Sequence, residues 1–264
     1  MNNYCYPDQK DYLTEIYIKK KELFPGYWYN SEQYILDVVK MHLNKHITPG
    51  DKVSLLDAGC GDGRLLHEIG YYFSNILAVD ADPGRLKSAI KSVKESELAQ
   101  KVIFRNVSIE NINIENKFDA IFCSHVLQHV HTGTLKQILE KMSKLIKKNG
   151  LIFLMTCHSI LEHDYFIKSY LKGSELIEET INEEQFNQLV LNIEHILPIH
   201  FYARKALEKE LQKLGLDIID FKVFHQVENI PGIKTDRCID QLINADHSLQ
   251  MIAGRDMLIV AAGY

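Results

Sequence analysis

The sequence lacks several features that would assign a protein to a special class. Its five cysteines include no Cys-x-x-Cys pair, which gives neither a zinc-finger spacing nor a disulfide framework. No apolar run reaches the roughly 18 residues of a membrane-spanning helix, and no internal repeat or low-complexity tract is present. Hydrophobic residues at 46% and charged residues at 25% are therefore those of an ordinary globular protein with reduced thiols.

An excess of positive charge is also missing. Lys and Arg number 30 against 35 Asp and Glu, and the net charge of −5 has the wrong sign for binding a phosphate backbone. The first 21 residues carry Asp8, Asp11 and Glu15 instead of a basic start and an apolar stretch, unlike a signal peptide. We therefore expect no nucleic-acid partner, no membrane association and a cytoplasmic location.

The central part of the chain alternates short apolar runs with longer amphipathic ones. This order predicts an α/β fold with a parallel sheet covered by helices. Asp82 followed by Pro83 marks a helix start, with a capping carboxylate and proline at the first helical position. Strands are predicted at 53–57, 76–80, 101–105, 118–123, 151–156, 216–223 and 257–261, and helices at 64–72, from 82, at 135–146 and at 203–214.

Two segments stand outside this alternation and suggest three regions. Residues 1–50 look helical and rich in aromatic rings, and we expect them to form an N-terminal arm or cap. Residues 158–200 are predicted to be a helical insertion after the fifth strand, which leaves 51–157 and 201–264 as the main domain. Eight acidic residues and two lysines lie in this insertion. It is a candidate lid, because open α/β folds bind ligands beside the carboxyl ends of their strands; a solvated surface is the alternative.

The strongest local signal is the sequence Asp57-Ala-Gly59-Cys-Gly61-Asp-Gly63 between a predicted strand and a helix. Glycines at such a turn let the backbone pass close beneath a ligand, and the free amides at the helix start face that ligand. The spacing is G-x-G-x-G, whereas dinucleotide binders have G-x-G-x-x-G. A further acid, Asp80, ends the next strand, where a carboxylate can accept hydrogen bonds from a ribose.

At these residues the chain resembles the class I S-adenosylmethionine-dependent methyltransferases. Their first motif reads D/E-x-G-x-G-x-G, and their second strand ends in an acid. The resemblance covers about residues 34–153 and includes the fourth strand and its turn, 118–129, and the segment before strand five, 147–153. It implies a Rossmann-like, seven-stranded, mostly parallel sheet with helices on both faces. It also implies S-adenosylmethionine as cofactor, S-adenosylhomocysteine as product and an enzyme of the small-molecule type.

The resemblance also implies which residues contact the cofactor. Gly59 and Gly61 lie under its methionine part, Asp57 anchors the ammonium directly or through water, and Asp80 holds the ribose. Many relatives carry an acid after strand three that contacts the adenine amine, and this sequence has Val107 and Ser108 there. The further expected cofactor contacts are Ala81, Val107, Ser108, Ser124 and Tyr29.

The N-terminal aromatic rings carry two interpretations. Aromatic faces attract cations such as a sulfonium, and Trp28 and Tyr29 are the rings best suited to fold over the cofactor. Alternatively, these rings only dock an N-terminal helix on the sheet.

Three histidines are candidate catalytic residues. His125 follows the fourth strand at the ligand edge and is the first candidate for a general base; His129 and His158 are the others. A packing role is the alternative for His129. His125, His129 and His131 could also be interpreted as metal ligands, but no acid or cysteine completes the set, and we expect no metal.

The expected reaction is in-line methyl transfer to a nitrogen or an oxygen of a small, neutral or cationic acceptor. A protein or peptide acceptor is the rival within enzymes, and it would need an open groove. A cofactor-binding partner without its own acceptor site is the rival outside enzymes. Nicotinamide-dependent oxidoreduction fits Asp80 but not the glycine spacing.

Overall fold

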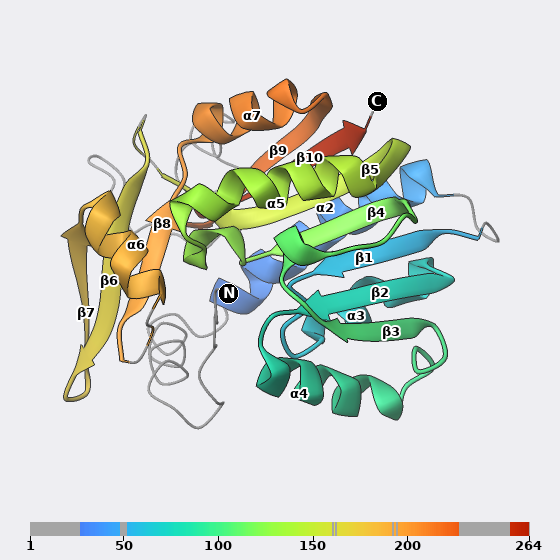
Figure 1. Cartoon of the computed structure of the whole chain (residues 1–264), viewed down its shortest axis with the longest axis horizontal. Helices are drawn as coiled ribbons and strands as arrows, with labels where there is room; N and C mark the ends of the chain where they lie inside the picture. The colour runs from blue at the N-terminus through green and yellow to red at the C-terminus, as the bar shows by residue number, and fades with distance from the viewer. Residues whose placement is uncertain are drawn as a thin grey trace.

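A seven-stranded sheet forms the centre of the computed structural model (Figure 1), which describes residues 27–47, 52–159, 161, 163–191, 193, 195–226 and 254–263. The strand order is β3-β2-β1-β4-β5-β10-β9, and β10 runs antiparallel to β5 and β9 while the other pairs are parallel. The strands are β1 (Ser54–Ala58), β2 (Asn75–Asp80), β3 (Val102–Asn106), β4 (Phe118–Ser124), β5 (Ile146–Cys157), β9 (Leu216–Gln226) and β10 (Gly254–Gly263).

Helices cover both faces of this sheet. Leu55 and Leu56 are neighbours on β1 but belong to two different buried clusters, because successive side chains of a strand point to opposite faces. The first face carries α5 (Thr132–Leu145) and α7 (Arg204–Lys213); the second carries α2 (Tyr27–His46), α3 (Arg64–Ile69) and α4 (Pro83–Lys94). The short 3-10 helices are η1 (Gly70–Tyr72), η2 (Ile109–Asn111) and η3 (Leu127–His129).

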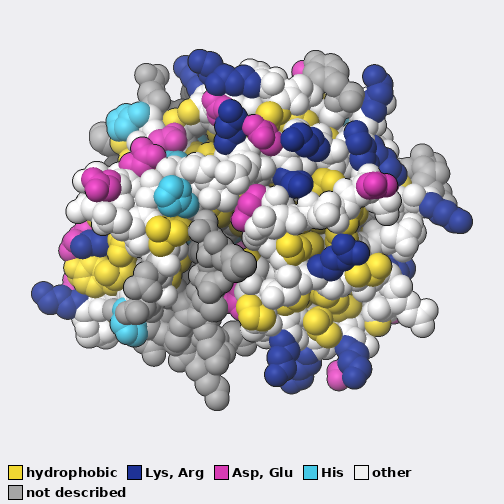
Figure 2. Space-filling view, in the orientation of Figure 1, with side chains coloured by type: hydrophobic (Ala, Val, Ile, Leu, Met, Phe, Trp, Pro, Cys, Tyr) yellow, Lys and Arg dark blue, Asp and Glu magenta, His cyan; other side chains and the backbone are white. Residues whose placement is uncertain are grey.

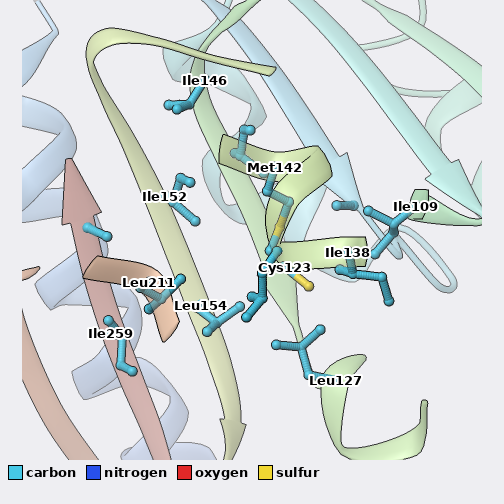
Figure 3. Close-up of a cluster of buried hydrophobic side chains, with 14 of the residues drawn as sticks. Ile109, Cys123, Leu127, Ile138, Met142, Ile146, Ile152, Leu154, Leu211 and Ile259 are labelled. Atoms are coloured by element: carbon cyan, nitrogen blue, oxygen red, sulfur yellow. The ribbon is translucent and has the colours of Figure 1, made fainter. Parts of the chain in front are cut away.

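The first of these clusters fixes α5 and α7 against the middle of the sheet. Figure 3 shows Met142 of α5 and Leu211 of α7 beside Ile152 and Leu154 of β5. All four side chains are at most 2% exposed. Burying one such aliphatic side chain contributes about 1.5 to 3 kcal/mol, so this packing holds β4 and β5 rigidly at the level where the predicted site begins.

The main sheet confirms the strands and helices predicted from the apolar rhythm. The helix start at Asp82 is confirmed in detail, since its carboxylate accepts from the amides of Gly84 and Arg85 at 2.6 and 3.0 Å. The fifth strand is longer than predicted and begins at Ile146. Of residues 1–50, only α2 and its flanks are described. Cys60, Cys123 and Cys157 are buried thiols outside any disulfide, whereas Cys5 and Cys238 lie outside the described residues.

The sequence predicted a helical insertion at 158–200, and this prediction is wrong, because the segment contains more strand than helix. It forms a second, antiparallel sheet of order β7-β6-β8, covered by one helix. Its elements are β6 (Tyr165–Lys172), β7 (Glu175–Ile181), α6 (Glu183–Leu191) and β8 (Leu197–Phe201). The sequence suggested that the acids of this segment lie on a solvated helical surface. Some of them instead form ion pairs across strands, and Glu179 of β7 binds Lys168 of β6 at 2.8 Å. Cross-strand pairs of this kind give no helical periodicity to detect.

Four hydrogen bonds attach the small sheet and its flanking residues to the turn after β4 and the start of α5. The ring of His129 bonds to the carbonyl of Pro198 at 2.8 Å, and the hydroxyl of Tyr202 donates to the carbonyl of Leu127 at 2.7 Å. Asn187 of α6 accepts from the amide of Thr132 at the start of α5, and its own amide group donates to the Thr132 hydroxyl, both at 2.9 Å. The small sheet therefore fixes the position of η3 at the carboxyl edge of the main sheet.

Within the described residues, no helix is long and apolar enough to cross a membrane. Figure 2 shows Lys and Arg side chains spread over the helices of the face it presents, with Asp and Glu between them. Neighbouring charges of opposite sign limit the field that one sign can build up on this face.

Candidate functional site

The glycine turn after β1 has the conformation that its sequence requires. Gly59, Gly61 and Gly63 have φ angles of 85°, 53° and 79°, the left-handed region in which other residues are strained. The amide of Gly59 donates to the carbonyl of Val79 at 2.8 Å, which joins the turn to β2. A Cβ on Gly59 would lie 2.2 Å from a methyl carbon of Val126, so the turn after β4 packs directly on this glycine.

Asp80 organises the second turn of the site. One carboxylate oxygen accepts from the amide of Gly61 and the other from the amide of Asp82, each at 2.8 Å. Burial raises the pKa of Asp80, and these two amides and the nearby Arg85 oppose that shift. A carboxylate has about four lone-pair positions, so Asp80 can hold the glycine turn and still accept from a ligand's hydroxyls.

Asp57 is a fully buried carboxyl at the end of β1, with 2% of its surface exposed. One of its oxygens has no hydrogen-bond partner among the residues that the structure describes. Burial, and after it the negative charge of Asp80, raise the pKa of Asp57 to about 7. A buried acceptor without a partner costs about 1 to 3 kcal/mol, so this site favours a ligand that brings a cation or a donor.

The segment after β3 places the two residues expected near the adenine close to Asp80. The amide of Val107 donates to the carbonyl of Asp80 at 3.1 Å. The side-chain amide of Asn106 donates to the carbonyls of Asp80 and Ala81, at 2.9 and 3.0 Å. Ala81 and Val107 thus lie on adjoining turns, as the cofactor prediction requires.

Ser108 begins η2 and is already engaged by two neighbours. Its hydroxyl donates to a carboxylate oxygen of Glu110 at 2.8 Å and accepts from the amide group of Asn111 at 2.7 Å. An acid, Glu110, thus stands two residues after Ser108, with its carboxylate against the Ser108 hydroxyl.

His125 ends β4 in an unusual backbone conformation. Its φ of 55° lies in the left-handed region, and its amide donates to the carbonyl of Met155 at 2.9 Å. Strain of this kind concentrates at functional sites. The His125 ring meets the ring of Phe224 edge-on at 6.2 Å, and about a third of the side chain, 31%, is exposed.

Three polar side chains form a network beside His125. The Nδ1 atom of His125 lies 3.1 Å from the amide nitrogen of Gln128 and 4.0 Å from a carboxylate oxygen of Asp256. The amide oxygen of Gln128 accepts from the Thr156 hydroxyl at 3.1 Å. Gln128, Thr156 and Asp256 are all under 5% exposed, so the network is a buried support behind a partly exposed ring.

The other candidate histidines lie in more packed surroundings. His129 is 2% exposed and bonds to Pro198, which favours the packing role. His158 is 4% exposed and meets the ring of Phe221 edge-on at 6.0 Å. The Nδ1 atom of His131 accepts from the amide of Gly133 at 3.0 Å. Among the described residues, no group of three His, Cys, Asp or Glu side chains could hold a metal ion.

Two expected cofactor contacts remain. The Ser124 hydroxyl lies at the end of β4, 3.5 Å from the sulfur of Met155. Tyr29 and Trp28 belong to α2, but their side chains lie outside the described residues.

The family model described as a methyltransferase domain matches residues 27–220, which include the glycine turn, the end of β2 and the turn after β4. The chain belongs to the class I S-adenosylmethionine-dependent methyltransferases. The family, the α/β fold with its mostly parallel sheet, and the cofactor predicted from the sequence are thereby confirmed.

Known proteins similar to this methyltransferase agree with the fold. The ubiquinone biosynthesis O-methyltransferase of Rickettsia akari is 28% identical over 124 residues, 47% of this chain and 47% of that protein. The chain thus matches about half the length of that relative. An S-adenosylmethionine-dependent methyltransferase from Clostridium acetobutylicum has a TM-score of 0.56 at 16% identity, over 95% and 97% of the two chains.

A third similar protein has been solved with its cofactor. The magnesium protoporphyrin IX methyltransferase of Synechocystis PCC 6803, with bound S-adenosylmethionine, has a TM-score of 0.54 at 13% identity over 89% of this chain and 80% of that one.

The residues at the glycine turn fit S-adenosylmethionine better than a pyrophosphate. Asp57, Asp62 and Asp82 each have a buried carboxylate oxygen without a partner in the described part of the chain, and Asp80 stands among them. Negative groups at this density repel a phosphate and attract a positively charged ligand. An amino-acid-linked nucleoside with an ammonium and a sulfonium has the matching charge.

Four residues of the candidate site were not predicted from the sequence. Gln128 stands three residues after His125, a spacing that brings side chains together in a helical turn, so this contact could have been predicted. Thr156 and Asp256 come beside His125 through the pairing of β4 with β5 and of β5 with β10. Sequence spacing does not reveal such tertiary proximity. The fourth residue is Glu110, whose carboxylate accepts from the Ser108 hydroxyl.

Proposed function

We propose that this methyltransferase transfers a methyl group from S-adenosylmethionine to a nitrogen or an oxygen of a small-molecule acceptor. The observation that carries the proposal is the contact between two turns: Val126, the residue after His125, packs on Gly59 of the glycine turn. A side chain that can take up a proton therefore lies beside the turn suited to the cofactor's methionine part.

Three features of the turn would bind the cofactor. The unpartnered oxygen of Asp57 would accept from its ammonium group, and the glycine backbone at Gly61, where a Cβ would meet only the end of the Arg85 side chain, would allow close approach. The Asp80 carboxylate would accept from the ribose hydroxyls, because it ends β2 at the carboxyl edge of the sheet.

The cofactor supplies a methyl group on a positively charged sulfur, which is already a strong electrophile. The protein therefore has to orient the acceptor, exclude water and take up the proton that an N–H or O–H acceptor loses. His125 is suited to the last task, since its imidazole is partly exposed at the ligand edge and histidine is the side chain that most often serves as a general base.

The charges around the site support a neutral or cationic acceptor. Asp256 lies buried beside His125, and the acids of the glycine turn face the same edge of the sheet. An acceptor with its own phosphate would be repelled by them. The Rickettsia relatives are named O-methyltransferases, which supports oxygen as the methylated atom.

The test is to incubate the full chain with methyl-labelled S-adenosylmethionine and fractionated cell extract, and then to identify the labelled product. Label in a low-mass compound supports the proposal. Label in polypeptides would instead indicate a protein acceptor, and cofactor binding without label in any fraction would indicate a non-catalytic binding partner. The exposed His67, which bonds to Ser92, provides a matched control: His67→Ala should transfer label as the wild type does.

A further inference from the structure

The buried carboxylate of Asp256 lies behind the ring of His125. Its oxygen is 4.0 Å from Nδ1, and only 4% of the Asp256 side chain is exposed. We propose that Asp256 is a positioning residue: it holds the proton of the neutral imidazole on Nδ1 and so leaves Nε2 to accept the proton of the methyl acceptor. This inference rests on the proposed role of His125.

The His125 backbone limits where the ring can go. The left-handed conformation, with φ 55°, is held by the hydrogen bond from its amide to Met155. Around the ring, β10 presents Asp256, η3 presents Gln128 and β9 presents the uncharged Phe224. Asp256 thus brings a carboxylate to the Nδ1 side of the ring, and Arg255, its neighbour on β10, interacts electrostatically with that carboxylate.

Gln128 by itself does not select a tautomer. In the structure its NH₂ group faces Nδ1 of His125 and its oxygen accepts from the Thr156 hydroxyl, each at 3.1 Å. Exchanging the amide's oxygen and nitrogen keeps both contacts, so the position of the amide alone does not assign the two atoms. If its NH₂ group faces the ring, Nδ1 is the acceptor and the proton sits on Nε2, which then cannot act as a base. If its oxygen faces the ring, Nδ1 carries the proton. The Thr156 hydroxyl fits both arrangements, because it donates and accepts.

The negative charge of Asp256 favours one of these two tautomers. A carboxylate close to Nδ1 favours a proton on that atom, and it favours the imidazolium that forms during the reaction even more strongly. Screening by salt is weak because Asp256 is buried. The orientation that follows has the Gln128 oxygen toward Nδ1–H and its NH₂ group toward Thr156.

The proton balance of the step is then simple. The acceptor's N–H or O–H bond breaks as its lone pair forms the new bond to the methyl carbon, while the carbon–sulfur bond breaks and its electron pair stays on sulfur. The released proton binds Nε2 of His125. The ring becomes an imidazolium with protons on both nitrogens, and Asp256 stabilises that charge from the Nδ1 side.

The experiment is nitrogen NMR of the full chain labelled with ¹⁵N-histidine, with the His125 signals assigned by their loss in His125→Asn. In the wild type above the His125 pKa, we expect Nδ1 to be protonated and Nε2 to be unprotonated. Asp256→Asn should move the proton toward Nε2 and lower the His125 pKa by about one pH unit. Turnover should fall about tenfold to a hundredfold with little change in acceptor KM, and Asp256→Glu should restore part of it.

Asp220→Asn is the matched control. Asp220 lies on β9 and bonds to the ring of His42 at 2.8 Å. The same substitution is therefore made at another His–Asp contact. It should leave the His125 signals unchanged.

Two outcomes overturn the inference. One is a wild-type His125 with its proton on Nε2, which needs no variant to observe. The other is an Asp256→Asn protein with the tautomer and pKa of the wild type. A further variant, Gln128→Leu, should keep the proton on Nδ1; a move to Nε2 there would give the role to the amide. If His125→Asn transfers methyl groups at full rate, the proposed role of His125 fails instead, while the NMR result still decides what Asp256 does.

Discussion

Val126 and Gly59 are in direct contact although 67 residues separate them in the sequence. A Cβ on Gly59 would lie 2.2 Å from Cγ2 of Val126, a distance that side chains do not tolerate. The glycine is therefore required twice, by its φ of 85° and by its neighbour. This contact joins the glycine turn to the turn that carries His125.

Gly59→Ala should strongly destabilise the protein and weaken cofactor binding, because the new methyl group collides with Val126. Gly173 separates the collision from the strain of a left-handed backbone. Its φ is also left-handed, at 64°, but a Cβ there meets nothing within 4 Å. Gly173→Ala should cost only about 1 to 2 kcal/mol. Thermal melting of both variants measures the difference. The double variant Gly59→Ala/Val126→Ala should recover part of the loss; equal melting of the two single variants would contradict the collision.

Cofactor affinity should depend on pH through Asp57. Its pKa of about 7 in the ligand-free protein means that the charged carboxylate, which a cation needs, forms as pH rises through 7. S-adenosylmethionine should therefore bind about tenfold more weakly at pH 6 than at pH 8, and binding should release a proton. Calorimetry at both pH values, in two buffers of different ionisation enthalpy, measures affinity and proton release. In Asp57→Asn the affinity should be low and independent of pH.

The same carboxyl should lower stability at neutral pH. The folded-state pKa lies above the ordinary value of 3.8, so the folded protein loses stability relative to the unfolded chain as pH rises from 3.8 through 7. Asp57→Asn removes this loss. Without ligand its Tm should exceed that of the wild type by roughly 10 °C at pH 8 and by little at pH 4. A Tm difference that does not change with pH would contradict the burial argument.

The sequence predicted those parts of the fold that depend on local rules. Apolar periodicity located the strands of the main sheet, Asp82 and Pro83 marked a helix start, and the glycine spacing predicted the left-handed turn after β1. These signals act within a few residues of each other. The strands of the insertion were not predicted, because short strands such as β7 mix exposed and half-buried residues and show no clear period.

The support behind His125 could not be predicted for a different reason. Asp256 lies 131 positions away and reaches the site only because β10 pairs antiparallel with β5, with Asp256 opposite Cys157. A single sequence contains no signal for that register. The position of His125 directly after β4 was predictable, since the fourth strand is a clear apolar run, whereas its role in catalysis stays a prediction.

Asp80→Ala should weaken S-adenosylmethionine binding by about 1 to 3 kcal/mol through the loss of charged hydrogen bonds to the ribose. It also removes the acceptor for the amides of Gly61 and Asp82, so the turn should lose order as well. Asp119→Ala is a useful comparison, because Asp119 binds Ser54 and Lys147 at the amino end of β1 and β4. It should lower the melting temperature and leave cofactor affinity unchanged. Calorimetry decides, and an unchanged affinity in Asp80→Ala would remove Asp80 from the ribose site.

His125→Ala should reduce turnover by about a hundredfold or more while leaving the cofactor affinity close to that of the wild type. The reason is that the His125 ring points toward Gln128 and Asp256, whereas the contact with the glycine turn is made by its neighbour Val126. His129→Ala provides the contrast, since the ring of His129 bonds to Pro198 in the small sheet. That variant should lose stability more than turnover per folded molecule. Calorimetry, melting and label transfer on the same preparations separate the two histidines, and an equal loss of affinity and turnover in His125→Ala would make His125 a cofactor ligand.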